Sequence, residues 1–201
     1  MLPKYLKPTK EFDLIRLGQD NDGGYLVEKE SIKKSNGLIT LGLGYDWSFE
    51  KDFYDFTTKK IFCYDHTVNY SGIKKLCRKL ITSYFFRMFK PKYVLKKNFF
   101  DKKFKNIFLF RDYKKFFSSK ATHIEKRIGS GNNGIMLNEI LDTKKDLFPV
   151  FLKIDIEGSE YRIFNEIIKN QNYFSGIAIE LHDVDLHLEK IKDLIDKLDM
   201  E

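Results

Sequence analysis

A short apolar run closes on two glycines at Leu38-Ile39-Thr40-Leu41-Gly42-Leu43-Gly44. A run of this length, apolar on both faces and ended by a turn, is typical of a buried strand in a parallel sheet. Four further runs are expected to form strands, over residues 61–65, 121–128, 150–155 and 176–181. Helical segments separate these strands, and the alternation predicts an α/β, Rossmann-like sheet that is mainly parallel and has helices on both faces.

The helices are expected from their apolar spacing. After the glycine turn, Asp46 or Ser48 is a candidate cap for a helix that carries Phe49, Phe53 and Phe56 inward. Further helical segments are expected over residues 70–89, 106–117, 138–141, 159–169 and 185–198. We expect residues 129–134, which are rich in glycine and asparagine, to form a loop.

The length of 201 residues fits a single domain over 1–201, in which residues 1–37 form an N-terminal cap and residues 66–120 a basic, aromatic-rich helical insertion. From Lys74 to Arg127 there are 18 basic and 3 acidic residues, a local charge of +15, whereas the rest of the chain carries −8. A basic face attracts phosphate, acidic glycans or anionic lipid. The segment is expected either to face the substrate or to be a solvated helical face, and it carries no recognised nucleic-acid motif.

The two cysteines and the first residues of the sequence indicate which cellular compartment to expect. Cys63 and Cys77 lack CxxC spacing, so the sequence indicates two reduced, buried thiols and neither a zinc site nor a disulfide framework. The first residues lack the apolar core of a signal peptide. No run approaches the roughly 18 apolar residues that span a bilayer, and we expect a cytoplasmic protein without a transmembrane segment.

The glycine turn and an aspartate 21 residues after it are the first candidate site. A strand that ends in Gly42-Leu43-Gly44 and leads into a helix lets a ligand approach the backbone closely. Trp47 occupies the third glycine position of the dinucleotide fingerprint, which disfavours a nicotinamide cofactor. At the tip of the second strand, Asp65 can accept hydrogen bonds from ribose hydroxyls. The alternatives are a plain tight turn and a capping aspartate.

Carboxylates and a histidine follow the fourth and fifth strands. Asp155, Glu157 and Glu160 crowd one strand end, and like charges so close favour a metal, a basic partner or a shared proton. Neutralisation by Lys153 and by helix N–H groups is the alternative. His182, in Glu180-Leu181-His182-Asp183, is a candidate general base, although a lone histidine at a strand end is often structural. His66, His123 and His187 are weaker candidates.

Together these motifs resemble the FkbM family of methyltransferases. The closest matches are Lys153-Ile154-Asp155-Ile156-Glu157-Gly158-Ser159-Glu160-Tyr161 and Ile179-Glu180-Leu181-His182-Asp183. Two further stretches are similar to other segments of the family. They are Leu41-Gly42-Leu43-Gly44 with Ser48-Phe49-Glu50, and Arg16-Leu17-Gly18 with Asn21-Asp22-Gly23-Gly24-Tyr25. The resemblance covers residues 16–65 and 137–184 and is poor over 66–120.

The resemblance implies a class I methyltransferase that uses S-adenosylmethionine to methylate a hydroxyl of a sugar or another small molecule. The basic segment would suit an anionic acceptor. The catalytic residues expected are His182, Asp155 and Glu157. The implied cofactor-binding residues are Gly42, Leu43, Gly44, Asp65, His66, Ile128, Gly129 and Asp155. No resident metal is expected, and Mg²⁺ on Asp155, Glu157 or Asp183 is the alternative to a protein base.

The resemblance also implies a departure at the C-terminus. The family fold continues with two more strands after its last helix, whereas this sequence stops at Glu201. Either the sequence is a fragment or the C-terminal hairpin is missing. In its absence we expect the fifth strand to be an exposed edge, through which copies of the chain could pair. The alternative functions are a degenerate methyltransferase that serves as a binding or partner protein, and a nicotinamide-dependent sugar enzyme.

Overall fold

The computed structural model describes residues 7, 10–20, 23–88 and 108–198, and it divides into two compact units. One unit comprises Met1–His66 and Thr122–Glu201, and the other comprises Thr67–Ala121. The second range differs by one residue at each end from the insertion expected over 66–120.

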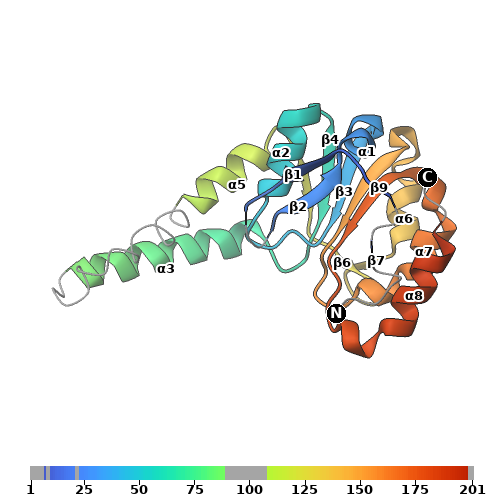
Figure 1. Ribbon diagram of the computed structural model, residues 1–201. Coiled ribbons are helices and arrows are strands. Elements are labelled where there is room, and N and C mark those ends of the chain that lie inside the picture. The colour runs from blue at the N-terminus through green and yellow to red at the C-terminus, as the bar shows by residue number, and fades with distance from the viewer. Residues whose placement is uncertain (1–6, 8–9, 21–22, 89–107, 199–201) are drawn as a thin grey trace. The chain divides into compact units, whose positions relative to one another are not determined.

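A five-stranded parallel sheet forms the centre of the first unit (Figure 1). Its strands are β3 (Gly37–Leu41), β4 (Lys60–Tyr64), β5 (Thr122–Ile124), β8 (Val150–Ile154) and β9 (Phe174–Ile179). They lie in the order β5-β4-β3-β8-β9, and every neighbouring pair is parallel. The chain first runs outward through β4 and β5 and then returns to β8, so the direction of winding reverses between β3 and β8. The expected α/β, Rossmann-like fold is confirmed.

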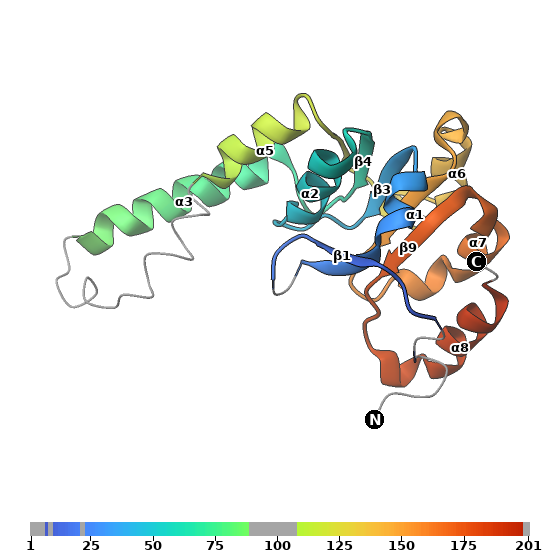
Figure 2. The same ribbon diagram turned by 45° about the horizontal axis from the view of Figure 1, so that its top comes forward.

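Helices cover both faces of this sheet (Figure 2). All five residues of β3 and all five of β8 are buried, which is why both read as mainly apolar runs, with Lys153 as the one charged residue among them. On one face lie α1 (Lys29–Lys34) and α2 (Ser48–Thr57), and the ring of Phe49 in α2 packs 6.3 Å from that of Phe151 in β8. The other face packs against α6 (Leu137–Asp142), α7 (Phe164–Lys169) and α8 (Leu188–Lys197).

The helix after the glycine turn differs from the expectation in one residue. Phe49 and Phe53 are buried, but Phe56 is 44% exposed. The buried stripe of α2 also includes Glu50, which rotates the stripe away from Phe56 on the last turn. Asp46 lies two residues before the helix, and its Oδ1 accepts the N–H of Ser48, the first helical residue, at 2.9 Å.

Two other expected elements are shorter or interrupted. The third strand, expected over 121–128, is β5 alone, because a turn in which the N–H of Lys126 donates to the carbonyl of Ile124 ends it. Residues 127–128 instead form β6 (Arg127–Ile128), which pairs with β7 (Gly134–Ile135) around the expected loop. The helix expected over 159–169 is divided into a 3-10 turn, η4 (Glu160–Arg162), and α7. Short 3-10 turns also occur at η3 (Lys145–Leu147), η5 (Gln171–Tyr173) and η6 (Val184–Leu186).

The N-terminal segment adds an antiparallel hairpin that the sequence patterns did not predict. It consists of β1 (Leu14–Leu17) and β2 (Tyr25–Glu28). This hairpin brings Tyr25 to the carboxyl ends of β8 and β9, where its hydroxyl contacts both Asp155 and Glu180. The second unit contains α3 (Tyr70–Met88) and α5 (Leu109–Phe117), which correspond to the helices expected over 70–89 and 106–117; residues 89, 106 and 107 lie outside the described residues.

The edge strand of the sheet borders an open groove. Within the described residues β9 pairs with β8 alone, and a groove of about 640 Å³ runs beside it. Apolar side chains of β9 and α8 line the groove, among them Ile177, Ile179, Ile191 and Leu194. No described helix has both the length and the apolar character to cross a membrane.

Candidate functional site

The glycine turn at the end of β3 is tied to the end of β4. Gly42 and Gly44 have φ angles of +85° and +59°, which glycine adopts without the steric penalty that other residues incur. The Oδ2 atom of Asp65 accepts the N–H groups of Leu43 at 2.8 Å and of Gly44 at 2.9 Å. This carboxylate is buried, so it both fixes the turn and places a negative charge beside it.

The turn also packs against the loop after β8, which yields a stability prediction. An added Cβ at Gly42 would lie 1.6 Å from the carbonyl oxygen of Asp155, whereas a Cβ at Gly44 would meet nothing within 4 Å. Both substitutions strain a left-handed backbone, and only the first creates a clash. We expect Gly42→Ala to lower the free energy of unfolding by about 1–3 kcal/mol more than Gly44→Ala, as measured by urea denaturation. Equal losses would contradict this close approach.

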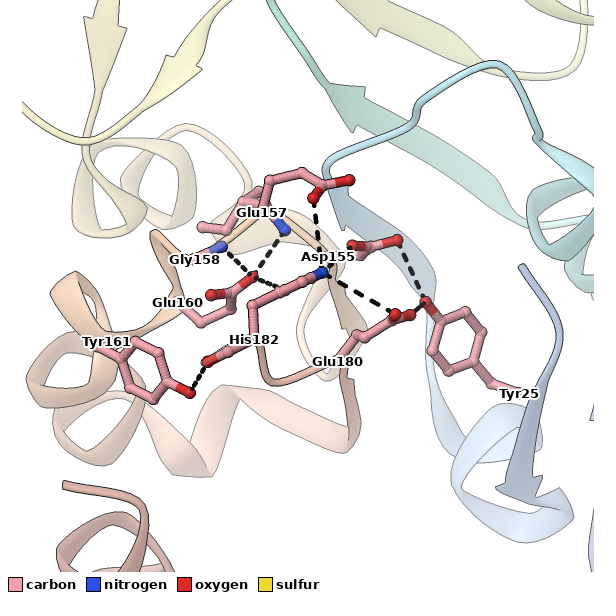
Figure 3. A network of polar contacts seen from close by, with 9 residues as sticks. Tyr25, Asp155, Glu157, Gly158, Glu160, Tyr161, Glu180 and His182 are labelled. Atoms are coloured by element: carbon pink, nitrogen blue, oxygen red, sulfur yellow. Dashed lines mark hydrogen bonds and ion pairs between the residues drawn. The ribbon is translucent and has the colours of Figure 1, made fainter. Parts of the chain in front are cut away.

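Acidic side chains gather at the carboxyl ends of β8 and β9 (Figure 3). Asp155 directly follows β8, and Glu180 directly follows β9. The hydroxyl of Tyr25 joins them, with its oxygen 2.6 Å from Oε2 of Glu180 and 3.3 Å from Oδ2 of Asp155. Since parallel strands end at one edge of the sheet, residues that are 25 positions apart in the sequence become neighbours here.

His182 lies at the centre of this acidic cluster (Figure 3). Its Nδ1 is 2.9 Å from Oε1 of Glu160, an oxygen that also accepts the N–H groups of Ile156 and Gly158. That oxygen acts as an acceptor, so Nδ1 carries the proton. The other ring nitrogen, Nε2, is then free of hydrogen in the neutral imidazole. It lies 3.6 Å from Glu157 and 4.0 Å from both Asp155 and Glu180.

The surrounding charges change the proton affinities of the cluster. Burial by itself would lower the pKa of His182, but its hydrogen bond to Glu160 and the negative charges of Glu160, Glu157 and Asp155 raise that pKa above its usual 6.5. Burial and the charge of Glu180 raise the pKa of Asp155, against the opposing effect of Lys153. The pKa of the Tyr25 hydroxyl is raised by burial and by both carboxylates, so it stays protonated and donates.

These effects predict how the titration of His182 responds to its neighbours. Glu157→Gln is expected to lower the pKa of His182 slightly, because it removes a negative charge that is 88% exposed and therefore well screened. The pKa is measured from the ring C–H signals in an NMR titration. Asp193→Asn is the control, because Asp193 pairs with Lys197 on α8. An unchanged or raised pKa in Glu157→Gln would contradict the geometry.

A buried ion pair lies between the sheet and α2. Lys153 projects from β8, and its Nζ is 3.4 Å from Oε1 of Glu50. The hydroxyl of Thr40 in β3 donates to the same oxygen at 2.9 Å. The pKa of Lys153 is raised overall: burial opposes its charge, but Glu50 and Asp155 favour it. The ammonium therefore stays charged and offsets part of the negative charge of the cluster.

A cavity of about 350 Å³ joins the glycine turn to the acidic cluster. Of the residues predicted from sequence, Leu43, Gly44, Asp155, Glu157 and His182 line it. Other lining residues are Gly23, Tyr45, Asp46, Lys153 and Glu180. These five predicted residues come from three separate segments of the sequence, and they share one cavity.

The remaining predicted residues lie around this cavity or away from it. Asp65 reaches it through its hydrogen bonds to the glycine turn and does not line it. Its neighbour His66 is exposed. The side chain of Ile128 is buried in the core, and Gly129 bridges to Ile135 in the small β6–β7 sheet. Neither Ile128 nor Gly129 lines the cavity.

No sequence pattern predicted a role in the site for Tyr25 or Glu50. Tyr25 acts on residues that lie 130 and 155 positions further along the chain, a contact that no local pattern reveals. Glu50 lies in the first turn of α2, where a carboxylate is common without any role in a site. The available signal was the charged Lys153 in the middle of an otherwise apolar strand, because a buried lysine requires an acidic partner.

Three side chains of the cluster are also arranged so that they could hold a cation. Ligand atoms of Asp155, Glu157 and His182 all lie within 4.8 Å of one another. Two carboxylates and an imidazole suit several divalent metals. Asp183, the third residue considered for Mg²⁺, is not in this group.

In comparisons with known proteins, the chain matches no protein-family model, no curated protein and no solved structure.

Proposed function

We propose that this chain is an S-adenosylmethionine-dependent methyltransferase that methylates a hydroxyl group of a sugar or another small molecule. The observation that carries the proposal is the single cavity that joins the glycine turn of β3 to His182 and its carboxylates. This cavity lies at the carboxyl ends of the strands where the winding reverses, which is where open α/β sheets bind ligands.

The residues at the turn suit a nucleoside ligand with an amino-acid tail. Gly44 leaves the space above the turn open, because nothing lies within 4 Å of where its Cβ would be. We assign Gly42, Leu43 and Gly44 to the methionine part and Asp65 to the ribose hydroxyls. His66, Ile128 and Gly129 remain the proposed residues on the adenine side.

The charge of the cavity suits a sulfonium cofactor. Asp155, Glu157 and Glu180 give this cavity more negative than positive side chains, since among the described residues that line it Lys153 is the only cation apart from a protonated His182. A cation is attracted to such a region. The third glycine of the dinucleotide motif is replaced by Trp47, which disfavours a nicotinamide cofactor.

His182 is the proposed general base. In its neutral form, Nε2 faces the cavity and takes the proton of the acceptor hydroxyl as the O–C bond forms and the S–C bond breaks. The cofactor supplies the electrophilic methyl group and leaves as a thioether. Glu160 holds the ring through Nδ1, and the nearby carboxylates stabilise the imidazolium that results. Alignment of the acceptor oxygen with the methyl carbon and sulfur supplies much of the rate.

The proposal is tested by titrating the chain with S-adenosylhomocysteine in a calorimeter. We expect saturable binding at one site. Asp65→Asn should weaken it about tenfold or more, because it removes a charge-assisted hydrogen bond to the ribose, and the surface control Asp193→Asn should not. Binding without any methyl transfer to a range of hydroxyl acceptors would favour a degenerate binding protein. Tight binding of NAD⁺ in place of S-adenosylhomocysteine would favour the nicotinamide enzyme.

A further inference from the structure

The two units of the chain have opposite charges. Counted over the full sequence, residues 67–121 contain 16 basic and 2 acidic residues, whereas the rest contains 20 basic and 27 acidic residues. The unit Thr67–Ala121 thus carries a formal charge of +14 and the rest of the chain −7. A bias in amino-acid composition alone would have enriched lysine in both units, so the asymmetry points to a role for the second one.

Seven of the basic side chains that the structure describes in this unit lie on one exposed face of each helix. On α3, the spacing of Lys74, Lys75, Arg78 and Lys79 places them on one exposed face, opposite the buried Ile73 and Cys77. On α5, the exposed residues are Arg111, Lys114 and Lys115, opposite the buried Tyr113 and Phe116. The aromatic faces pack the helices together, with the rings of Tyr70 and Phe110 4.8 Å apart.

These seven basic residues have no acidic partners within the described part of the chain. None of them forms an ion pair there, and Asp112 is the only acidic residue in the described part of the unit. Within that part of the chain, no acidic side chain neutralises them, which leaves their charge to attract an outside partner. A surface of this kind binds a polyanion by releasing counterions.

Exposed apolar side chains lie next to the basic ones. Ile81 is 50% exposed. It follows Arg78 by three residues and Lys74 by seven, a spacing that places all three on the same side of α3. Phe108 is 54% exposed and lies three residues before Arg111 at the start of α5. An aliphatic side chain offers nothing on which a nucleic-acid base can stack, but it can enter the boundary between lipid headgroups and acyl chains.

We propose that the unit Thr67–Ala121 is a docking surface for an anionic lipid bilayer. Its lysines and arginines contact phosphate headgroups, and Ile81 and Phe108 insert beside them. Basic residues close to such a surface each contribute about 1 kcal/mol of binding free energy. The proposal is independent of the cofactor, and its failure would leave the proposed methyl transfer unaffected.

The test is co-sedimentation of the whole chain with lipid vesicles at about 0.1 M salt. We expect binding to vesicles that contain phosphatidylglycerol and none to pure phosphatidylcholine. Lys74→Gln/Arg78→Gln/Lys115→Gln should weaken binding roughly 100-fold, because three contributions of about 1 kcal/mol are removed. Lys34→Gln/Lys169→Gln/Lys192→Gln removes the same charge from the first unit and should change little.

A second variant separates a bilayer from a nucleic acid. Ile81→Ser keeps every charge and should weaken vesicle binding about tenfold, the effect of losing one inserted aliphatic side chain. Binding of oligouridine should be weaker than that of vesicles and insensitive to Ile81→Ser. The proposal is overturned by the absence of binding to phosphatidylglycerol, by equal binding of the two triple variants, or by tighter binding of oligouridine.

Discussion

His182→Gln is expected to lower the rate constant of methyl transfer by about 10²–10⁴-fold, the usual contribution of a positioned general base. The reason is that Nε2 is the basic atom that faces the cavity, while Nδ1 is engaged with Glu160. Glutamine fills similar space but cannot take the proton. The measurement is the turnover of labelled S-adenosylmethionine with a hydroxyl acceptor, compared with that of the wild-type chain.

The pH dependence of the same reaction tests whether His182 acts as a general base. The base must be neutral, so the rate should rise with pH through the raised pKa of His182, above 6.5, and then level off. His187→Gln is the matched control, because this ring packs on Tyr161 and does not line the cavity. An unchanged rate and pH profile in His182→Gln would show that another group takes the proton.

Lys153→Ala is expected to lower the free energy of unfolding by about 3–5 kcal/mol, the usual effect of removing one partner of a buried ion pair. It would leave Glu50 as a charge that is fully buried, with its Oε2 already lacking a hydrogen bond. Only the Thr40 hydroxyl would remain to stabilise the carboxylate. The loss is measured by urea denaturation followed by circular dichroism.

Two controls separate this effect from the removal of a lysine as such. The double variant Glu50→Gln/Lys153→Met should recover most of the lost stability, since it leaves no unpaired buried charge. Lys33→Ala breaks an exposed pair with Glu30 and should cost less than about 1 kcal/mol. A small loss for Lys153→Ala, similar to that for Lys33→Ala, would contradict the buried pair.

The sheet was predictable because its central strands are buried on both faces. Residues 38–41 and 150–154 therefore read as mainly apolar runs, interrupted only by Thr40 and Lys153. The third strand was predicted too long because β5 is an edge strand, half exposed, and its alternation continues past the turn at Lys126. Edge strands carry weaker sequence signals, because one side of each lacks a neighbouring strand.

The candidate site was predictable where its residues follow strands directly. Asp155 and His182 follow β8 and β9, so the parallel topology alone brings them together. Tyr25 was not predictable in this way, because the β1–β2 hairpin that carries it belongs to no repeated pattern. The position of Phe56 was also missed, since the polar Glu50 takes a buried place in α2 that its charge alone would assign to the surface.

We propose that one nucleoside ligand lies across the tips of β3 and β4 and reaches the carboxylates after β8. A crystal structure with S-adenosylhomocysteine bound tests this binding mode most directly. We expect the ribose hydroxyls on Asp65, the amino-acid tail over Gly44 and the sulfur next to Asp155. Ligand found in the groove beside β9, or an empty cavity at saturating ligand, would contradict it.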